Sequence, residues 1–360
     1  MDRRAVLGGA CAAFLLGAAC ASARGSDVRV ARVGRGPDPR AGHAWTLSLT
    51  VRPASFHGAI RVTADGPVRL SARAAGGNGA YRARLVFPRA GSWRLAATAG
   101  GTRTRLGSVR VLAPAPLVFE EPTGIDVRPD GSLLVVEFDR RRLLRVVPAT
   151  GRVTPLATFG KPWGVASAAS GAVFVSSQNT VERIDPGHAP VIVASVDPAL
   201  EVGPVAVTPT GDLIYATASA LYRLPGGKPG TPERLAAGTT LAGSHGIAVT
   251  SGGVLLVSDT SNNRILRVDG DTVTSFAMLG GPRGIDVAPD GTVYVAAGDA
   301  HRIVHYSAVG ERLGVVGPRF ADAYALSVAA DGTVYAVDLG GRGIIRRIAS
   351  DGTASVVTAG

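Results

Sequence analysis

The sequence predicts an all-β protein of two domains, a small antiparallel sandwich followed by a six-bladed β-propeller. Three observations lead to this prediction. The phrase GIDVAPDGTVYVA at 284–296 has a near-copy at 124–136. Four weaker copies bring the total to six, at intervals of 38 to 42 residues. Upstream, residues 26–112 contain short alternating strands without helical periodicity.

Each repeat can be explained from its residues. In the turn PDG, Pro fixes φ, the Asp side chain bonds back to its own backbone and Gly accepts a positive φ. In the runs on either side of the turn, both the odd and the even positions are apolar. This pattern is typical of strands that neighbouring blades cover on both faces. A period of about 40 residues with several short strands is typical of a propeller blade. We therefore expect six four-stranded blades over 117–360, closed where Leu117–Phe119 meet the last strand at 353–358.

The upstream domain alternates polar and apolar residues in strands bounded by turns. These strands are predicted at 44–51, 59–64, 67–74, 81–87, 93–98 and 107–112, and APAP at 113–116 is the predicted linker. The stretch YRARLVFPRAGSWRLAATA (81–99) resembles Ig-like sandwiches of the YtkA or FixH type, which accompany exported bacterial domains. The resemblance implies an Ig-like sandwich at 26–112.

Residues 1–23 have the features of a secretory signal: a charged start, an apolar stretch and small residues at the end. Arg3 and Arg4 resemble a twin-arginine motif. Cleavage after ASA (21–23) would release a soluble protein, whereas LGAAC (16–20) resembles a lipobox that would leave Cys20 lipidated. Both cysteines lie in this segment, so no disulfide and no Cys-based metal site are expected beyond it. We expect an exported protein, periplasmic or extracellular, whose mature chain has no transmembrane span.

The positive charge belongs to the upstream domain. Residues 24–113 contain sixteen Arg and three acidic residues, although the whole chain carries only +11. An anionic envelope surface could bind this domain. A solvated face in a chain that prefers Arg to Lys explains the same composition and is favoured. Nucleic acid is not expected as a partner, because the arginines lack interleaved aromatic residues and the protein is predicted to be exported.

The chain lacks the common nucleophile, phosphate-loop and zinc-protease motifs, so the candidate site is the mouth of the propeller channel. The residue before the aligned glycine of each repeat should face this mouth: Thr123, Trp163, Gly203, His245, Arg283 and Tyr324. Loops after the second strands should add polar residues, namely Glu137, Asp139, Arg140, Asp259, Asn262, Asp299, His301, Asp338 and Arg342. Polar loop tips that only contact water are the competing interpretation.

Two stretches of the ring point to a known family. PRGIDVAPDGTVYVAAGDAHRIVHY (282–306) and HGIAVTSGGVLLVSDTSNNRILRV (245–268) resemble NHL repeats. The ring at 117–360 resembles the six-bladed TolB-like group, which includes gluconolactonase- and regucalcin-like lactonases and amidating lyases. In the lactonases a Glu before the first blade and later Asn and Asp residues hold a divalent cation. Glu120 or Glu121 matches the first position, but the later positions hold neither Asn nor Asp. The lyases hold zinc through several His, and only His245 stands at a comparable place.

The sequence therefore predicts an exported NHL-type propeller that acts as a binding or interaction module for an unknown small molecule, protein or peptide. Its candidate ligand site comprises Trp163, His245, Arg283 and Tyr324, with Glu121 and Asp259 as acidic partners. An Arg and a His beside two aromatic faces suit an anionic or planar ligand. No cofactor is expected. The alternative is a lactonase-like hydrolase or lyase with a variant active site at the same mouth, where a divalent cation could take part.

Overall fold

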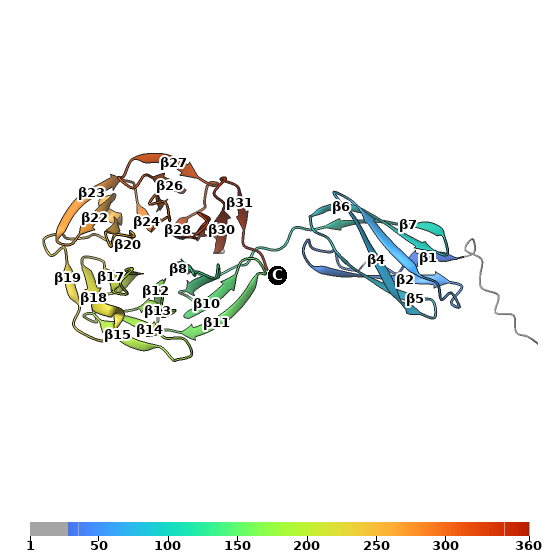
Figure 1. Ribbon diagram of the computed structural model, residues 1–360, viewed down its shortest axis with the longest axis horizontal. Helices are drawn as coiled ribbons and strands as arrows, with labels where there is room; N and C mark the ends of the chain where they lie inside the picture. The colour runs from blue at the N-terminus through green and yellow to red at the C-terminus, as the bar shows by residue number, and fades with distance from the viewer. Residues whose placement is uncertain (1–27, 35, 342, 360) are drawn as a thin grey trace, which may run out of the picture. The chain divides into compact units, whose positions relative to one another are not determined.

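A computed structural model describes residues 28–34, 36–341 and 343–359. The predicted signal, with Cys20, and the rim candidate Arg342 lie outside these residues. The chain divides into two units, Met1–Pro114 and Ala115–Gly360. Figure 1 shows strands throughout both units, with the second built as a ring.

The first unit is an antiparallel β-structure around one apolar core. Its strands lie in the hydrogen-bonded order β1-β2-β5-β4-β3-β6-β7. Their bounds are β1 (Arg29–Arg32), β2 (Ala44–Arg52), β3 (Ile60–Asp65), β4 (Arg69–Gly77), β5 (Ala80–Val86), β6 (Gly91–Ala99) and β7 (Thr102–Val111). β4 pairs with β3 through Arg69–Ala74 and with β5 through Ala75–Gly77, so it passes from one layer to the other.

Alternating side chains fill the space between the two layers of this unit. Along β2 the burial alternates at every second residue, as the sequence pattern predicted. The rings of Phe87 and Trp93 pack edge to face at 5.0 Å, and both side chains are fully buried. The structure thus has the sandwich character that the sequence predicted, while its Ig-like kinship stays a prediction.

The second unit is a six-bladed propeller, as predicted. In the described residues its strands form six four-stranded antiparallel sheets (Figure 1). The inner strand of each blade is β8 (Pro122–Val127), β12 (Pro162–Ser167), β16 (Val202–Val207), β20 (Ser244–Val249), β24 (Pro282–Val287) and β28 (Ala323–Val328). The second strands are β9 (Leu133–Glu137), β13 (Val173–Ser177), β17 (Leu213–Thr217), β21 (Leu255–Asp259), β25 (Val293–Ala297) and β29 (Val334–Asp338).

The outer half of each blade is more exposed than the inner half. The third strands are β10 (Arg142–Val147), β14 (Thr180–Ile184), β18 (Leu221–Leu224), β22 (Arg264–Asp269), β26 (Arg302–Tyr306) and β30 (Ile344–Ile348). The fourth are β11 (Arg152–Thr158), β15 (Val191–Ser195), β19 (Glu233–Leu235), β23 (Thr272–Met278), β27 (Arg312–Val316) and β31 (Ala354–Val356). The described helices are the short 3-10 turns η2 (Pro225–Gly227) and η3 (Thr260–Asn262), and none could cross a membrane.

The ring closes where the sequence predicted. The backbone N–H of Leu117 donates to Val357 O at 2.9 Å, and that of Phe119 donates to Gly343 O at 2.8 Å. Phe119 and Val357 are buried in one apolar cluster with residues of the first and last blades. The first residues of the unit therefore complete the last blade and join the two ends of the ring.

The PDG turn of the first blade and its ADG variant in the sixth blade hold their shape through the Asp side chain. Asp130 accepts the N–H of Ser132 at 2.9 Å, and Asp331 accepts that of Thr333 at the same distance. Gly131 and Gly332 have φ values of +75° and +78°, which strain any side chain. This is the turn chemistry that the repeated phrase implied.

Glycine also occupies the aligned position of most of the repeats because the inner strands pack closely at the ring centre. A Cβ on Gly246 would lie 2.4 Å from Arg283 O, and one on Gly284 would lie 2.6 Å from the Cα of Ala325. Inner strands of neighbouring blades therefore approach so closely that only glycine fits at these two positions. This packing brings the residues before the glycines close to the channel axis.

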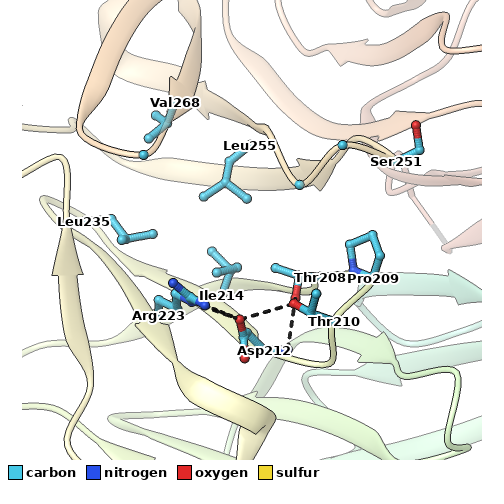
Figure 2. A pocket seen from close by; sticks show the side chains of 13 residues that line it. Thr208, Pro209, Thr210, Asp212, Ile214, Arg223, Leu235, Ser251, Leu255 and Val268 are labelled. Atoms are coloured by element: carbon cyan, nitrogen blue, oxygen red, sulfur yellow. Dashed lines mark hydrogen bonds and ion pairs between the residues drawn. The ribbon is translucent and has the colours of Figure 1, made fainter.

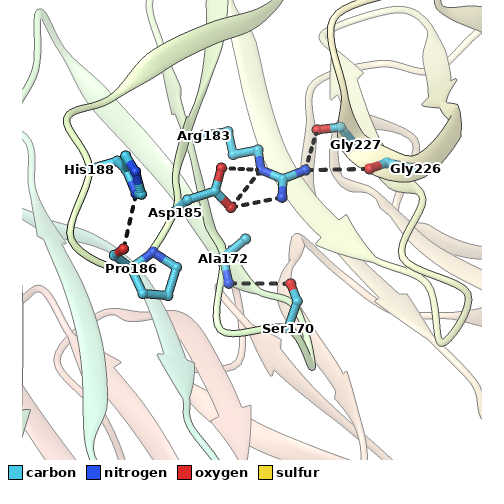
Figure 3. Close-up of polar contacts among 8 residues, drawn as sticks. All are labelled: Ser170, Ala172, Arg183, Asp185, Pro186, His188, Gly226 and Gly227. Carbon is cyan, nitrogen blue, oxygen red and sulfur yellow. Dashed lines mark hydrogen bonds and ion pairs between the residues drawn. The ribbon is translucent and has the colours of Figure 1, made fainter.

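Side chains also lock neighbouring blades together nearer the rim of the ring. Arg183 on β14 pairs with Asp185 at 2.7 Å and donates to Gly227 O in η2 at 3.1 Å (Figure 3). Its guanidinium lies 5.6 Å from the centre of the Phe174 ring. One cation therefore joins the second blade to the third and covers the apolar contact between them.

Candidate functional site

Three rings meet at the mouth of the channel. Trp163, His245 and Tyr324, here called the aromatic triad, start the inner strands of the second, fourth and sixth blades. Their ring centres are 6.0 Å apart for Trp163–His245 and 6.1 Å apart for each of the other two pairs. The alternate blades supply Thr123, Gly203 and Arg283 at this position. Small residues in two of the blades leave room for the rings to converge.

Arg283 joins the triad, so the structure brings together four of the predicted site residues. Its guanidinium carbon lies 5.1 Å from the centre of the Tyr324 ring, which is cation–π range. Its Nη1 also forms an ion pair with Asp322 at 2.6 Å. Arg283 is therefore held between an aromatic face and a carboxylate. Any anionic group of a ligand would compete with Asp322.

Two further side chains at the mouth were missed from the sequence. The Phe138 ring packs edge-on against Trp163 at 6.0 Å, and Lys161 Nζ lies 6.0 Å from the centre of the Phe138 ring. Phe138 directly follows the second strand of the first blade, and Lys161 precedes the inner strand of the second. Phe138 could have been predicted from the sequence, because it is an aromatic residue in a loop that was expected to be polar.

His245 is held in one tautomer. Its Nδ1 lies 2.7 Å from Gly243 O, which can only accept, so Nδ1 carries the hydrogen. The Thr260 hydroxyl, 3.1 Å from Nδ1, itself donates to Pro282 O at 2.6 Å. Burial lowers the pKa of His245, and the charge of Arg283 lowers it further. Nε2 therefore keeps its lone pair near neutral pH and has no hydrogen-bond partner in the described part of the chain.

Tyr324 keeps its proton. Burial raises the pKa of this phenol, and the nearby charges of Glu121 and Asp322 add to the rise, although Arg283 opposes it. The Tyr324 hydroxyl is thus a neutral donor beside a fixed imidazole acceptor. The triad can offer both hydrogen-bond roles to one ligand.

Carboxylates gather on the side of the mouth formed by the first and last blades. Glu121, Asp139 and Asp322 line a hollow of about 790 Å³ together with Arg140. Partial burial raises the pKa of Glu121, and a hydrogen bond and charge repulsion from Asp139 raise it further. The carboxyl of Glu121 therefore takes up a proton more readily than a free glutamate does. Glu121, predicted from the sequence, therefore belongs to the mouth.

Asp259, the sixth predicted site residue, lies elsewhere. Its side chain has no solvent exposure and accepts from Ala242 N at 2.7 Å, Asn262 Nδ2 at 2.9 Å and Arg264 Nε at 2.7 Å. Its hydrogen-bonding capacity is used inside its own blade, which leaves no acceptor aimed at a ligand. The predicted role as an acidic partner in the mouth does not agree with this placement.

The same arrangement, here called the blade clamp, recurs in the first and sixth blades. Glu137 pairs with Arg142 and accepts Glu120 N at 2.8 Å. Asp338 pairs with Arg346 at 2.8 Å and accepts the N–H of Asp322 at 2.9 Å. Glu137, Asp259 and Asp338 are all buried. Each of them bonds the loop before the inner strand of its blade to the second and third strands. The clamps thus position the mouth loops without lining the mouth.

Below the triad the channel narrows to a space of about 60 Å³ lined by the inner strands. Asp126 and Asp286, from the two copies of GIDV, lie on these strands. Asp286 accepts the Ser327 hydroxyl at 3.1 Å and Val328 N at 2.7 Å, while Asp126 accepts the Ser167 hydroxyl. Burial raises the pKa of both, to about 7 for Asp126. Neither acid was predicted as a site residue from the sequence.

The side chains around the mouth differ from those of a metal site. In the described residues no group of three or more His, Cys, Asp or Glu side chains is arranged to hold a metal ion. The positions that would complete a site around Glu121 carry the triad and Arg283, whose charge opposes a cation.

A second hollow, of about 330 Å³, lies between the third and fourth blades (Figure 2). Ile214, Leu235 and Leu255 form its apolar wall. Asp212 at its base is already bonded to Arg223 at 2.6 Å and to Gly226 N at 2.7 Å. Its main charged groups satisfy each other, so it offers less for recognition than the mouth.

Comparison with known proteins agrees with this architecture. The model of the NHL repeat matches residues 243–267. A search of curated proteins finds no match. A catalytically inactive virginiamycin B lyase from Staphylococcus aureus, solved with quinupristin, has a TM-score of 0.53 at 17% identity, over 68% of this chain and 87% of its own. A gluconolactonase from Xanthomonas campestris has a TM-score of 0.56 at 16% identity, over 67% and 88%.

A third solved structure is similar over more of the chain. A protein of unknown function from Bacteroides thetaiotaomicron has a TM-score of 0.55 at 14% identity, over 91% of this chain and 98% of its own. The chain thus contains an NHL repeat and a six-bladed propeller resembling gluconolactonase- and regucalcin-like folds. At these identities the likeness concerns the fold, and function has to be argued from the site.

Proposed function

We propose that the protein is a binding module whose ligand sits on the aromatic triad at the channel mouth. The observation that carries this proposal is the convergence of three rings from alternate blades, at centre-to-centre distances of 6.0 to 6.1 Å. Rings packed this closely form a rigid floor that closes the narrow channel beneath them. A ligand would therefore rest on the floor and would not enter the channel.

The chemistry of the mouth specifies a class of ligand. An aromatic floor favours a molecule with a flat apolar face, such as a sugar ring, a lactone or a planar heterocycle. His245 Nε2 can accept a hydrogen bond and the Tyr324 hydroxyl can donate one. The carboxylates of Glu121 and Asp139 suit hydroxyl or amine donors, whereas Arg283 suits an anionic substituent that displaces Asp322.

Replacing Trp163 with Ala is expected to weaken ligand binding at least tenfold, because it removes the largest face of the floor. Binding would be measured by calorimetry after a thermal-shift screen of lactones, cell-wall fragments and anionic metabolites. Arg283→Ala and His245→Ala should each weaken binding of the same hit, more strongly for anionic compounds in the first case. Tyr324→Phe, which keeps the ring, is the matched control and should lose less affinity than Trp163→Ala. Equal affinity in Trp163→Ala and the unmodified protein would refute the site.

A lactonase-like hydrolase is the second candidate, and the state of His245 favours it. A neutral imidazole whose Nδ1–H is fixed by Gly243 O presents Nε2 as a base beside the Tyr324 ring. Such a base could activate water against a ring carbonyl. Turnover of a lactone that disappears in His245→Gln would establish this activity in place of simple binding. Loss of this turnover when a chelator is added would show that the activity also requires a divalent cation.

We further propose that the protein is exported, on the evidence of residues 1–23. In a bacterial host the full chain should appear outside the cytoplasm, with its signal removed. The variant Cys20→Ser distinguishes lipidation at Cys20 from cleavage after Ala23. If the protein is lipidated, the variant loses its membrane association. If the signal is cleaved after Ala23, the variant gives the same soluble product as the unmodified protein. Retention in the cytoplasm with an intact amino terminus would contradict export.

A further inference from the structure

The first unit carries its positive charge unevenly on its two outer faces. The outer face formed by β4, β3, β6 and β7, here called the arginine face, carries seven exposed arginines: Arg61, Arg69, Arg73, Arg94, Arg103, Arg105 and Arg110. The opposite outer face carries four, namely Arg29, Arg52, Arg82 and Arg84. The arginine face thus carries the larger share of the eleven arginines on these two faces.

The register of the arginine face places like charges together. Arg61 on β3 lies directly opposite Arg73 on β4. Asp65 is the one acid of the described residues on this face, and it is shared between Arg69 at 3.2 Å and Arg103 at 3.0 Å. Like charges directly opposite in a sheet destabilise it, so this face carries uncompensated repulsion that a bound anion would relieve.

The face is also hollowed along its β6–β7 edge. Arg94, Arg103 and Arg105 line a groove of about 820 Å³ together with Asp65, the partner of Arg103, and Ala96 and Ser108 lie between them. A bulge shifts the register here, so that Leu95 faces Gly107 and Ala96 faces Arg105. Gly107, Ala96 and Ser108 have little or no side chain, and the long arginines stand around the space that they leave. The groove is thus formed by the local sequence.

We propose that this groove binds a linear polyanion, a chain with oxyanion groups repeated along its length. Strand geometry sets Arg103 and Arg105 on β7 about 7 Å apart, and Arg94 projects from the neighbouring strand opposite Ser108. This row of charges matches repeated anionic groups better than a single ion. The guanidinium fork pairs with carboxylate and phosphate oxygens in two parallel bonds. A groove also favours a chain over a flat lipid surface. Among the described residues, the outward-facing positions of these four strands carry no large apolar side chain that would insert into a membrane.

The test uses the full chain and two triple variants with equal loss of charge. Arg94→Gln/Arg103→Gln/Arg105→Gln removes the groove, and Arg52→Gln/Arg82→Gln/Arg84→Gln removes three arginines of the opposite face. Binding of inorganic polyphosphate and of alginate would be measured by calorimetry at several salt concentrations, after circular dichroism has confirmed folding. The groove variant should bind at least tenfold more weakly and show a shallower dependence of log K on log salt. The control variant should change less than threefold.

Two results would overturn the proposal. Equal losses in both variants would mean that overall charge, and not the groove, attracts the polymer. Binding to phosphatidylglycerol vesicles with none to either polymer would identify a lipid surface instead. Comparison of polyphosphate with alginate distinguishes a phosphate chain from a carboxylate chain. This site does not depend on the channel mouth, so triad variants should leave polymer binding unchanged.

Discussion

Replacing Arg264 with Ala is expected to lower the free energy of unfolding by about 3–5 kcal/mol. Asp259 is fully buried, and Arg264 Nε at 2.7 Å is the cation that balances its charge. The variant would leave this carboxylate buried with only neutral donors, Ala242 N and Asn262 Nδ2. Urea unfolding followed by circular dichroism measures the loss as a lower midpoint.

The second blade supplies a matched control for this clamp. At its equivalent position Ser177 accepts Lys161 N at 3.1 Å, and Thr180 lies opposite it. An uncharged pair can thus hold the same loop. The double variant Asp259→Ser/Arg264→Thr copies that pair and should be more stable than Arg264→Ala, although it removes more groups. A loss below about 1 kcal/mol in Arg264→Ala would show that the ion pair does not hold the blade.

The clamp also connects stability to the site. Ala242, whose N–H Asp259 accepts, directly precedes Gly243, and Gly243 O orients the imidazole of His245. In the sixth blade the clamp accepts the N–H of Asp322, the residue that pairs with Arg283. Clamp residues should therefore act on ligand binding only as positioning residues, through the loops that they hold.

Repeat spacing predicted the propeller because spacing reflects the geometry of the ring. Copies as weak as WGVASAASGAVFVS still form blades, because each blade needs only a turn, apolar strands and a small residue near the axis. The same logic located Trp163, His245, Arg283 and Tyr324, since one repeat position in every blade faces one centre. Periodicity therefore predicts both the fold and the part of the site that repeats.

Periodicity could not separate clamp acids from mouth acids. Glu137 and Asp259 end second strands and were assigned to the rim as loop carboxylates, but the structure buries them. A signal was present: an Arg follows each of them by five residues and lies directly opposite across the next strand. The other blades have neither Phe nor Lys at the positions equivalent to Phe138 and Lys161, so the repeat pattern did not predict these two residues. Contacts unique to one blade depend on tertiary packing, which the pattern does not contain.

Asp126 illustrates a different limit, because the charge inside GIDV was visible but its environment was not. Burial raises the pKa of this carboxyl to about 7, and the neighbouring charge of Asp286 adds to the rise. Below about pH 4 it is protonated in both the folded and the unfolded chain. As pH rises from about 4 through 7, only the unfolded chain ionises freely, so the contribution of Asp126 to stability falls across this window.

Asp126→Asn is therefore expected to be more stable than the unmodified protein at pH 8, by at most about 4 kcal/mol for a pKa shift of about three units. Asn keeps an acceptor for the Ser167 hydroxyl but carries no charge. Urea unfolding at pH 3 to 8 should show the two proteins similar at pH 3 and increasingly different above pH 5. Asp286→Asn should move the transition of Asp126 to lower pH, because it removes the repelling charge.

A second variant, for which the opposite change in stability at pH 8 is expected, serves as the control for this test. Hydrogen bonds from Thr333 lower the pKa of Asp331, so its stabilising contribution is present above about pH 4 and is lost on acidification. Asp331→Asn should therefore be less stable than the unmodified protein at pH 8 and similar to it at pH 3. If Asp126→Asn also lost stability at pH 8, the ionised carboxylate would be a favourable part of the channel. Arg128, whose charge favours the ionised form of Asp126, would then be the partner to replace next.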